Sequence, residues 1–387
     1  MTNVILIPVL SLAAAYVITR PTGGMGLALP KGAQEGSLAT PLQRESGALA
    51  STPISASISL ASSTAILASS AAADPMLGGA YMLDPGPHSV SEVRDVAVHD
   101  AKRNKDLHAR IFYPNEPGTY PVIVFSHGAD GSQNCCDALT RHWASYGYVT
   151  LQPIDGTSAL SRRNPNEEDV RFVEAVGARG NDSAKWESWP KDISSLLDAL
   201  PTLPNRIPGL ADKIDMSEIG VGGHSAGAFA ADALAGALVN LPGHPGASFA
   251  DGRVKAVLLL SPPGPGEFGL TDHSWDHVAI PLLSMTGSLD RGAGNQGPDW
   301  KEIPYERSQP GDKYLVYVRG ASQTSFISAK SILPGRAAQG ELILGYTNSA
   351  CLAFWDAYLK GDLKAKLYLQ SNALADFSRD AVKLLRR

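Results

Sequence analysis

Cysteine, strong net charge and long apolar runs are all scarce in this sequence, and each shortage excludes a class of protein. Three cysteines, Cys135, Cys136 and Cys351, occur in 387 residues without metal-ligand spacing to a histidine, which excludes a disulfide scaffold or a zinc module. The net charge is −5, so we expect no basic surface for nucleic acid. The composition implies no metal and no organic cofactor, and it leaves the oligomeric state open.

The N-terminal region differs in composition from the rest of the chain. Residues 3–19 carry no charge. This uncharged run is long for the core of a signal peptide and short for a membrane span. Residues 34–73 are rich in alanine and serine and end in small residues suited to signal cleavage. We therefore predict a hydrophobic segment with a low-complexity extension over 1–85, a folded domain over 86–387, and a secreted or periplasmic protein. Membrane association through the N-terminal segment and an extension without a defined role are the alternatives.

Histidine is absent after His277, and the consequence depends on a motif upstream. Residues 223–227 read Gly-His-Ser-Ala-Gly, between a predicted buried strand at 217–222 and a predicted helix at 226–241. Strand, sharp turn and helix are the context of a G-x-S-x-G nucleophile elbow, which lifts the hydroxyl of Ser225 above the sheet edge. A serine nucleophile needs a base, and in this arrangement the base is a histidine that follows the acid in chain order.

Strand and helix patterns alternate along the chain. Residues 92–98 and 107–113 predict an antiparallel pair of strands. Apolar runs predict buried strands at 121–125, 148–152, 254–260, 280–285 and 313–318. Helices are expected at 136–146, at 349–359 and from Pro190, which suits a helix start. This alternation predicts an α/β fold whose mainly parallel central sheet has an antiparallel N-terminal edge and helices on both faces.

Further residues of suitable chemistry follow other strands. The loop 125–131 contains two glycines and can aim a backbone N–H at a developing oxyanion, with the N–H of Ala226 as the second donor. Asp290 comes at the end of a buried strand, where a carboxylate can orient an imidazole, and a turn-capping aspartate is the alternative. His127 is expected to shape its loop, and His224 to pack locally, away from the nucleophile.

Several stretches together resemble a known family. They are 109–114, 121–128, 142–148, 219–227, 261–266, 286–292 and 353–359, and they include Phe-Ser-His-Gly, Gly-His-Ser-Ala-Gly and Thr-Gly-Ser-Leu-Asp. Over roughly residues 92–370 the chain is similar to α/β-hydrolases of the dienelactone hydrolase-like group, near platelet-activating factor acetylhydrolases, chlorophyllases and bacterial cutinase-type polyesterases. The resemblance implies an α/β-hydrolase fold and a carboxylic ester hydrolase acting on a small-molecule ester or lipid-like substrate. It does not specify which ester.

The resemblance also implies roles for individual residues. Ser225 would be the nucleophile, Asp290 the acid, and the backbone N–H groups of Ala129 and Ala226 the oxyanion donors. Relatives carry their histidine in a Gly-Ala-x-His-x-x-Phe stretch after the last strand. Here residues 320–326 read Gly-Ala-Ser-Gln-Thr-Ser-Phe, so an amide occupies the histidine position.

That amide belongs to Gln323, and an amide is not a base near neutral pH. Three explanations remain open: a natural homologue with weak or no catalysis, an engineered or erroneous variant of an active esterase, and entry of another histidine into the site. Two functional classes also remain open. One is an ester hydrolase that acts through an acyl-enzyme with reduced or absent activity, and the other is a binding or sensor protein that keeps the hydrolase pocket. Segment 156–188, with Trp186 and Trp189, is expected to help form a pocket lid, with a core role for the tryptophans as the alternative.

Overall fold

The computed structural model describes residues 79–128, 136–154, 182–328 and 337–387. Most of the expected N-terminal extension, the expected oxyanion donor Ala129 and most of segment 156–188 lie outside the described residues. Export, membrane association and a lid formed by 156–188 therefore stay predictions.

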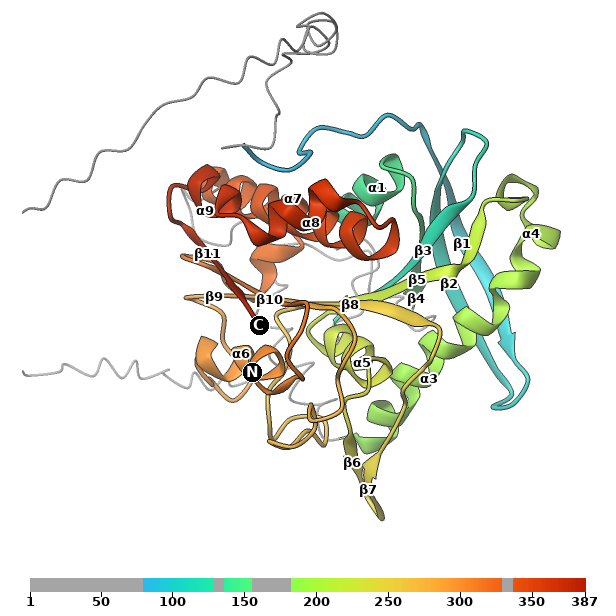
Figure 1. Ribbon diagram of the computed structural model, residues 1–387. Helices are drawn as coiled ribbons and strands as arrows, with labels where there is room; N and C mark the ends of the chain where they lie inside the picture. The colour runs from blue at the N-terminus through green and yellow to red at the C-terminus, as the bar shows by residue number, and fades with distance from the viewer. Residues whose placement is uncertain (1–78, 129–135, 155–181, 329–336) are drawn as a thin grey trace, which may run out of the picture. The chain divides into compact units, whose positions relative to one another are not determined.

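A nine-stranded sheet organises the described part of the chain, in the order β1-β2-β4-β3-β5-β8-β9-β10-β11 (Figure 1). Neighbouring strands from β4 to β10 pair in parallel, whereas β1–β2, β2–β4 and β10–β11 are antiparallel. The strands are β1 (Val90–Asp100), β2 (Lys105–Pro114), β3 (Tyr120–Ser126), β4 (Val149–Ile154), β5 (Ile214–His224), β8 (Val254–Leu260), β9 (Leu282–Gly287), β10 (Lys313–Val318) and β11 (Val382–Arg386). This order confirms the predicted α/β fold with an antiparallel N-terminal edge.

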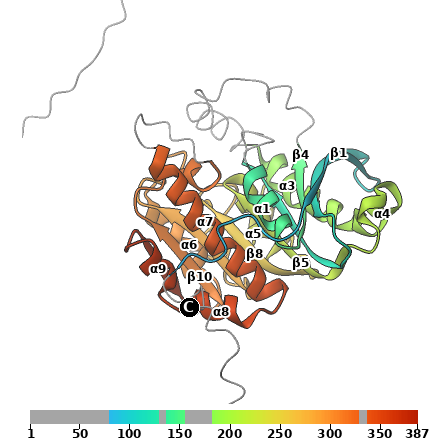
Figure 2. The same ribbon diagram turned by 90° about the horizontal axis from the view of Figure 1, so that it is seen from above.

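Helices cover both faces of the sheet. On one face lie α1 and α7, with α8 and α9 against α7; on the other lie α3, α5 and α6 (Figures 1 and 2). The helices are α1 (Asp137–Ser145), α3 (Ser183–Ala199), α4 (Leu203–Arg206), α5 (Ala226–Leu234), α6 (Pro298–Arg307), α7 (Ala337–Leu359), α8 (Leu363–Gln370) and α9 (Ala373–Phe377), with short 3₁₀ turns η2 (Leu200–Thr202), η3 (Pro208–Leu210) and η4 (Gln323–Phe326). A separate hairpin, β6 (Val239–Leu241) and β7 (His244–Ala247), follows α5.

Strand β3 shows why the central strands are continuous apolar runs. Val122 and Val124 are buried in the core shared with α3 and α5, whereas Ile123 and Phe125 are buried in the core shared with α7. Successive side chains of a strand point to opposite faces, so a strand covered on both sides is apolar at every position.

Two helix boundaries differ from those expected. Helix α5 ends earlier, at Leu234, because Gly236 takes a φ of 115° and turns the chain toward the β6–β7 hairpin. Helix α3 begins at Ser183, where the side chain of Asp182 caps its first turn, so Pro190 lies inside the helix and not at its start. The proline is buried on the face that packs against the sheet, where its ring contributes apolar contact.

The C-terminal part holds more regular structure than the sequence patterns predict. Helix α7 begins at Ala337, about three turns before the expected start at residue 349. Strand β11 pairs antiparallel with β10, from Tyr314 opposite Arg386 to Val318 opposite Val382. The sheet therefore has an antiparallel strand at both edges, because this short C-terminal strand covers the open side of β10.

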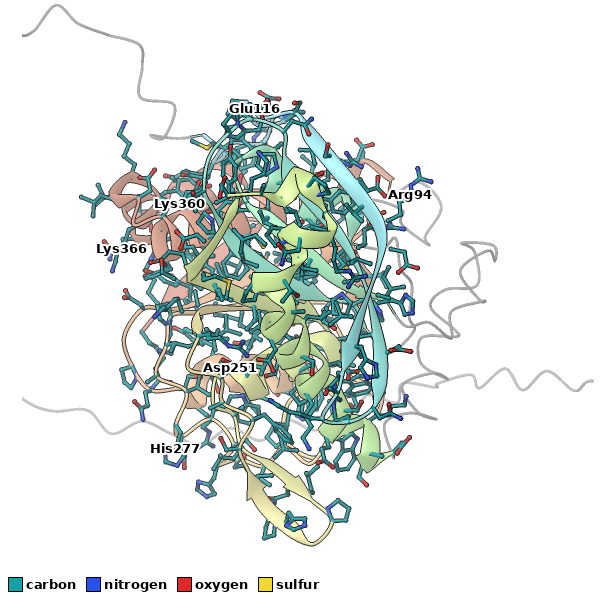
Figure 3. All side chains as sticks on the ribbon, turned by 90° about the vertical axis from the view of Figure 1, so that its right-hand side faces the viewer. Arg94, Glu116, Asp251, His277, Lys360 and Lys366 are labelled. Carbon is teal, nitrogen blue, oxygen red and sulfur yellow. The ribbon has the colours of Figure 1, made fainter. Side chains whose placement is uncertain are left out.

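Tyr81 ties the first described residues to the domain. It is 1% exposed, and its hydroxyl donates to Asp356 Oδ2 at 2.9 Å while that of Tyr148 donates to Oδ1 at 2.7 Å. Lys360, labelled in Figure 3, lies 2.7 Å from the same carboxylate. The packed region thus begins before residue 86, the expected start of the domain, because Tyr81 is bound to a buried carboxylate of α7.

Candidate functional site

Ser225 lies in the turn between β5 and α5, at the carboxyl edge of the parallel strands. Its φ of 55° and ψ of −115° are values that a non-glycine residue adopts only where the surrounding structure holds it. A Cβ on Gly223 would overlap the backbone of Gly227, and a Cβ on Gly227 would overlap the carbonyl oxygen of Ser126. The two glycines of the motif therefore let the turn close tightly.

Ala226 opens helix α5 directly after the serine. The first N–H groups of a helix have no partner within it, so the Ala226 N–H can serve a ligand in front of Ser225. The loop after β3 lies beside this helix end, and in it His127 Nδ1 donates to the carbonyl of Gly128 at 2.7 Å. That bond fits the loop-shaping role expected of His127. The other expected donor, Ala129, is outside the described residues.

Gln323 is the first residue of η4, in the loop after β10. The side chains of Ser322 and Ser325 hydrogen-bond reciprocally across this turn, which fixes its direction. Gln323 Nε2 donates to Ser225 Oγ at 3.0 Å, and its carbonyl oxygen accepts from His224 Nε2 at 2.9 Å. The structure thus brings the expected nucleophile and the residue at the histidine position into direct contact.

His224 has a role that its position in the sequence did not reveal. It is 2% exposed and binds the backbone of Gln323, so it holds the loop after β10 against the end of β5. All nine histidines belong to the described residues, and among these residues no histidine side chain hydrogen-bonds to Ser225. His127, on the oxyanion side, is turned to its own loop.

Asp290 follows β9 and is fully buried. Its carboxylate accepts from Ser261 Oγ at 3.0 Å and from Thr286 Oγ1 at 2.9 Å, and Lys301 Nζ lies 3.5 Å from Oδ1. Burial raises the pKa of the Asp290 carboxyl, and the charge of Lys301 opposes that rise. The carboxylate stands at the predicted strand end, but within the described ranges no hydrogen bond joins it to Gln323.

The loop after β9 and the loop after β10 nevertheless lie side by side. Leu289 N donates to the carbonyl of Ala321 at 3.0 Å, and Gly320 N donates to Ser288 Oγ at 2.8 Å. The two loops therefore meet through their backbones, while their polar side chains are bound to different partners.

Lys301 is the charged residue near the site that the sequence patterns did not single out. It lies on α6 and is 2% exposed, and its Nζ donates to Ser261 Oγ at 3.0 Å. The available signal was its spacing, because positions 301, 304 and 305 share one helical face and Pro304 and Tyr305 are both buried. A lysine on an apolar face needs a buried partner.

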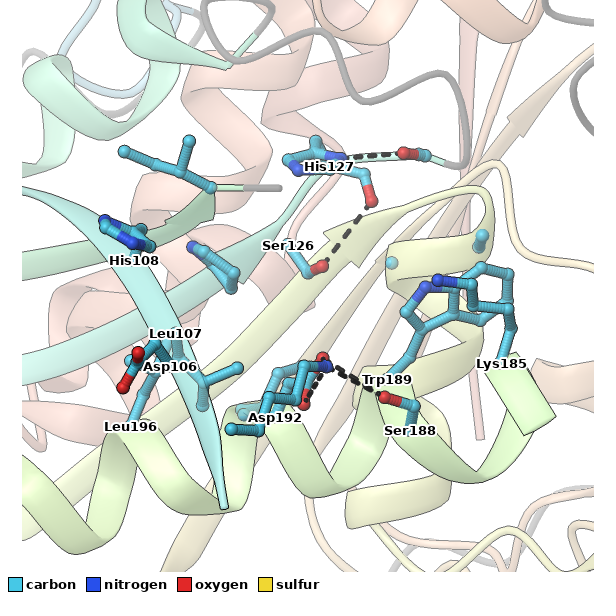
Figure 4. Close-up of a pocket in the computed structure, with 17 residues that line it drawn as sticks. Asp106, Leu107, His108, Ser126, His127, Lys185, Ser188, Trp189, Asp192 and Leu196 are labelled. Atoms are coloured by element: carbon cyan, nitrogen blue, oxygen red, sulfur yellow. Dashed lines mark hydrogen bonds and ion pairs between the residues drawn. The ribbon is translucent and has the colours of Figure 1, made fainter. Parts of the chain in front are cut away.

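A cavity of about 310 Å³ lies beside the start of α5 (Figure 4). Ala226 and Gly227 form part of its wall, together with the end of β3. The apolar lining comes from Leu107, Pro153, Ile154, Trp189, Ile193 and Leu196. Trp189 is held there by edge contacts with Phe229 and Phe268. An apolar space therefore adjoins the backbone donor at Ala226.

A charged cluster forms the opposite rim of this cavity. Lys105 Nζ lies 2.9 and 2.8 Å from the two carboxylate oxygens of Asp192 and donates to Ser188 Oγ at 3.0 Å; Figure 4 labels Ser188 and Asp192. The ammonium is thus already paired, which leaves the apolar side chains to dominate contact with anything in the cavity.

Two comparisons with known proteins agree with this geometry. The family model described as Chlorophyllase matches residues 80–242. Cutinase est2 of Thermobifida alba is 25% identical over 215 residues, which are 55% of this chain and 55% of that protein. The chain is thus similar to chlorophyllases and cutinases, and its sheet and helices have the α/β-hydrolase arrangement.

The segment matched by the family model contains only part of the site of this α/β-hydrolase. Ser225 and Ala226 lie inside the segment matched by the family model, whereas Asp290, Lys301 and Gln323 lie beyond it. The aligned part also spans about half the length of the curated relative. In the ranges that the structure describes, no helix has the length and hydropathy needed to cross a membrane, and no group of three or more His, Cys, Asp or Glu side chains is placed to hold a metal ion.

Proposed function

We propose that this hydrolase carries a serine-type carboxylic ester hydrolase site that acts through an acyl-enzyme, with weak or absent turnover because Gln323 stands where the base is needed. The observation that supports the proposal is the 3.0 Å hydrogen bond from Gln323 Nε2 to Ser225 Oγ. In this proposal Ser225 is the nucleophile of an elbow, Asp290 occupies the acid position, and the N–H groups of Ala226 and Ala129 bind the oxyanion.

The chemistry of the amide explains the expected loss of rate. When Ser225 Oγ attacks an ester carbonyl, its proton must pass to a base and then to the departing alcohol. Gln323 donates a hydrogen bond to Oγ and has no basic lone pair to take that proton. When one member of a triad is removed, a rate acceleration of about 10³–10⁴ over the reaction in water remains, and it is supplied by the oxyanion donors and by binding. Acylation and hydrolysis of the acyl-enzyme are therefore both slow, because both need the same base. With a p-nitrophenyl ester, hydrolysis is the slower step, because p-nitrophenolate departs without taking up a proton.

The cavity beside Ala226 supports a small-molecule ester or lipid-like substrate. Its volume of about 310 Å³ lies at the lower end of the range for small-ligand sites, and its wall is mainly apolar. An acyl group there would have its carbonyl oxygen near the start of α5, where a helix N-terminus stabilises developing negative charge.

A non-catalytic binding or sensor protein is the second candidate, and one observation favours it. Ser225 already accepts from Gln323, and the loop around position 323 is closed by its own serines and by His224. The serine hydroxyl therefore already has a hydrogen-bond partner with glutamine present, as a protein that binds esters without turning them over would need.

Labelling and burst kinetics on the parent protein and Ser225→Ala test the proposal. The parent is expected to react with a fluorophosphonate probe at Ser225, identified by peptide mass, and to release one p-nitrophenol per chain from p-nitrophenyl acetate before it stalls. Ser225→Ala is expected to do neither.

Two other results would decide differently. If the parent binds a non-hydrolysable phosphonate ester, followed by tryptophan fluorescence, but never becomes labelled, the binding-protein function is supported instead. If the parent turns over steadily and Gln323→Ala leaves kcat/KM unchanged, another base operates and the role assigned to position 323 is wrong.

A further inference from the structure

Lys301 and Asp290 form a charge pair inside the domain, and the proposed reaction gives Lys301 no role. Asp290 is fully buried and Lys301 is 2% exposed, with Nζ 3.5 Å from Oδ1. They come from different elements, the loop after β9 and helix α6. Taking two ions out of water costs several kcal/mol per ion unless each finds a partner, so both charges depend on this contact.

The ammonium of Lys301 is enclosed by acceptors. Nζ donates to Ser261 Oγ at 3.0 Å and lies 3.4 Å from the carbonyl oxygens of Ser261 and Pro262. Ser261 Oγ in turn donates to Asp290 Oδ1 at 3.0 Å. The lysine therefore reaches the carboxylate both directly and through a hydroxyl, which is the hydrogen-bonded arrangement that a buried ion pair requires.

A second buried lysine shows what burial does without a carboxylate. Lys313 is 0% exposed, and its Nζ donates to the carbonyls of Ala279 and Gly311 at 3.0 and 2.8 Å. Within the described residues no carboxylate lies within ion-pair distance of it. Burial lowers the pKa of Lys313 to about 8, so carbonyl oxygens alone do not fully preserve the charge. Lys301 differs from Lys313 in having Asp290.

We propose that Lys301 is the charge partner of Asp290, that it supplies the positive charge which an imidazolium supplies in a serine triad, and that the carboxylate is thereby neutralised with glutamine at position 323. Lys301 is then a positioning residue that keeps Asp290 as an anion. Calling Asp290 the acid position rests on the proposed function, whereas the pairing of the two charges does not. Glu267 is the other carboxyl on which Lys301 acts, since burial raises the pKa of Glu267 and Lys301 opposes the rise.

The pairing has a consequence for any base placed at position 323. An imidazole there would share Asp290 with a fixed positive charge, and a nearby cation makes a second proton harder to bind. Removing the lysine charge is therefore expected to raise the pKa of a histidine introduced at 323. A lysine with a purely structural role would not move that value.

The first experiment needs no catalysis. Urea midpoints are measured at pH 5 and pH 8 for the parent, Lys301→Met, Asp290→Asn and the double variant. Without the lysine, the carboxyl has a folded-state pKa raised above its unfolded value, so stability falls as pH rises and the loss is larger at pH 8. Without the carboxylate, the ammonium has a lowered folded-state pKa, so the loss is larger at pH 5. The double variant is expected to regain most of the loss.

Lys313→Met is the matched control for that cycle, because it removes a buried lysine that does not contact Asp290. The stability lost by Lys313→Met is expected to add to the stability lost by Asp290→Asn, so that the variant with both changes regains none of it. If the losses of Lys301→Met and Asp290→Asn are simply additive, the proposal is overturned. If Lys301→Met does not fold, Asp290→Asn alone decides, and equal losses at pH 5 and pH 8 overturn the pairing.

The second experiment follows kcat/KM for p-nitrophenyl acetate against pH in Gln323→His, with and without Lys301→Met. The acidic limb of the pH profile is expected to lie about one pH unit or more higher when Lys301 is absent. In the control, Gln323→His with Lys313→Met, the limb is expected at the same pH as in Gln323→His alone. An unmoved limb refutes the charge-partner role. If no Gln323→His protein is active, the proposed function fails instead, and the urea cycle still decides the pairing.

Discussion

Two stretches of the chain meet at Ser225, one ending near residue 242 and the other beginning there. The earlier stretch, within which the family model matches, supplies backbone: a serine at a φ of 55° and two glycines that allow the turn to close. The later stretch supplies side chains: Gln323 donates to the serine hydroxyl, and Lys301 lies against Asp290.

The difference teaches which parts of such a site can change while the fold stands. A turn closed by glycines is constrained by hard contacts, so any added side chain strains the sheet edge itself. A hydrogen-bonded side chain can be exchanged for another of similar reach, and only the chemistry changes. Two of the buried carboxylates repeat the contrast, since Asp290 has a lysine beside it and Asp232 of α5 has none among the residues described.

The largest expected effect comes from placing a histidine at position 323 in the later stretch. Gln323→His should raise kcat/KM for p-nitrophenyl acetate and butyrate on the order of 10³-fold, because an imidazole at 323 can take the proton of Ser225 and a triad acts as a unit. The gain should vanish when Ser225→Ala is added. A change below tenfold in a folded variant would mean that more than the base is missing from the later stretch.

Gly227→Ala should break the earlier stretch. The new Cβ would overlap the carbonyl oxygen of Ser126, and because that atom is backbone it cannot move aside without shifting β3. We expect a loss of about 3 kcal/mol in the free energy of unfolding, together with loss of labelling at Ser225. Gly252→Ala is the control, since nothing lies within 4 Å of a Cβ there. Equal losses for the two variants would argue against a sterically closed turn.

Asp232→Asn sharpens the comparison of the two carboxylates. Asp232 accepts from Trp275 Nε1 at 2.5 Å, its Oδ1 has no hydrogen-bond partner in the described part of the chain, and burial raises its pKa to about 7. Because the folded-state pKa lies above the unfolded one, this group stabilises the protein below about pH 4 and loses that contribution as pH rises through 7.

The asparagine variant should therefore lack a decline of roughly 4 kcal/mol in the free energy of unfolding between pH 4 and pH 7. Denaturant melts at several pH values measure this. Asp290→Asn is the contrasting control, because it leaves Lys301 unpaired and should destabilise the protein. Identical pH slopes for the parent and Asp232→Asn would refute the assignment of a protonated carboxyl.

The smallest expected effect concerns the start of the domain. Tyr81→Phe removes one hydroxyl from the Asp356 carboxylate and should cost about 1 kcal/mol in the free energy of unfolding. Tyr317→Phe is the control, since the Tyr317 hydroxyl makes no hydrogen bond within the described residues. If both variants match the parent in urea, residues before 86 add nothing to the domain.

Much of the fold could be predicted because its signals are local. The apolar run around Val122 predicts a strand covered on both faces, and the structure buries that residue in one core and Ile123 in the other. The ends of helices were harder to predict from the sequence. Pro190 reads as a helix start in isolation, but the cap at Asp182 begins α3 two turns earlier, and a local pattern cannot weigh two competing starts.

The site divides along the same line. Ser225 was predictable because five adjacent residues encode strand, turn and helix, and Gln323 was singled out because residues 320–326 resemble the stretch in which relatives carry their histidine. Lys301 was not predictable, because its partner Asp290 lies on a separate element. The contact between them depends on how α6 packs against β9, which no local pattern contains.

By itself the sequence determined the alternation of strands and helices, the tight turn at Ser225 and the absence of any histidine after His277. These properties depend on neighbours along the chain, through steric limits and the alternation of side chains. Only the tertiary structure decided that Gln323 hydrogen-bonds to the serine and that a lysine neutralises the buried carboxylate. Those contacts join residues 98 and 11 positions apart that lie on separate elements, and in a dry interior each charge or polar group takes the partner that packing brings within reach.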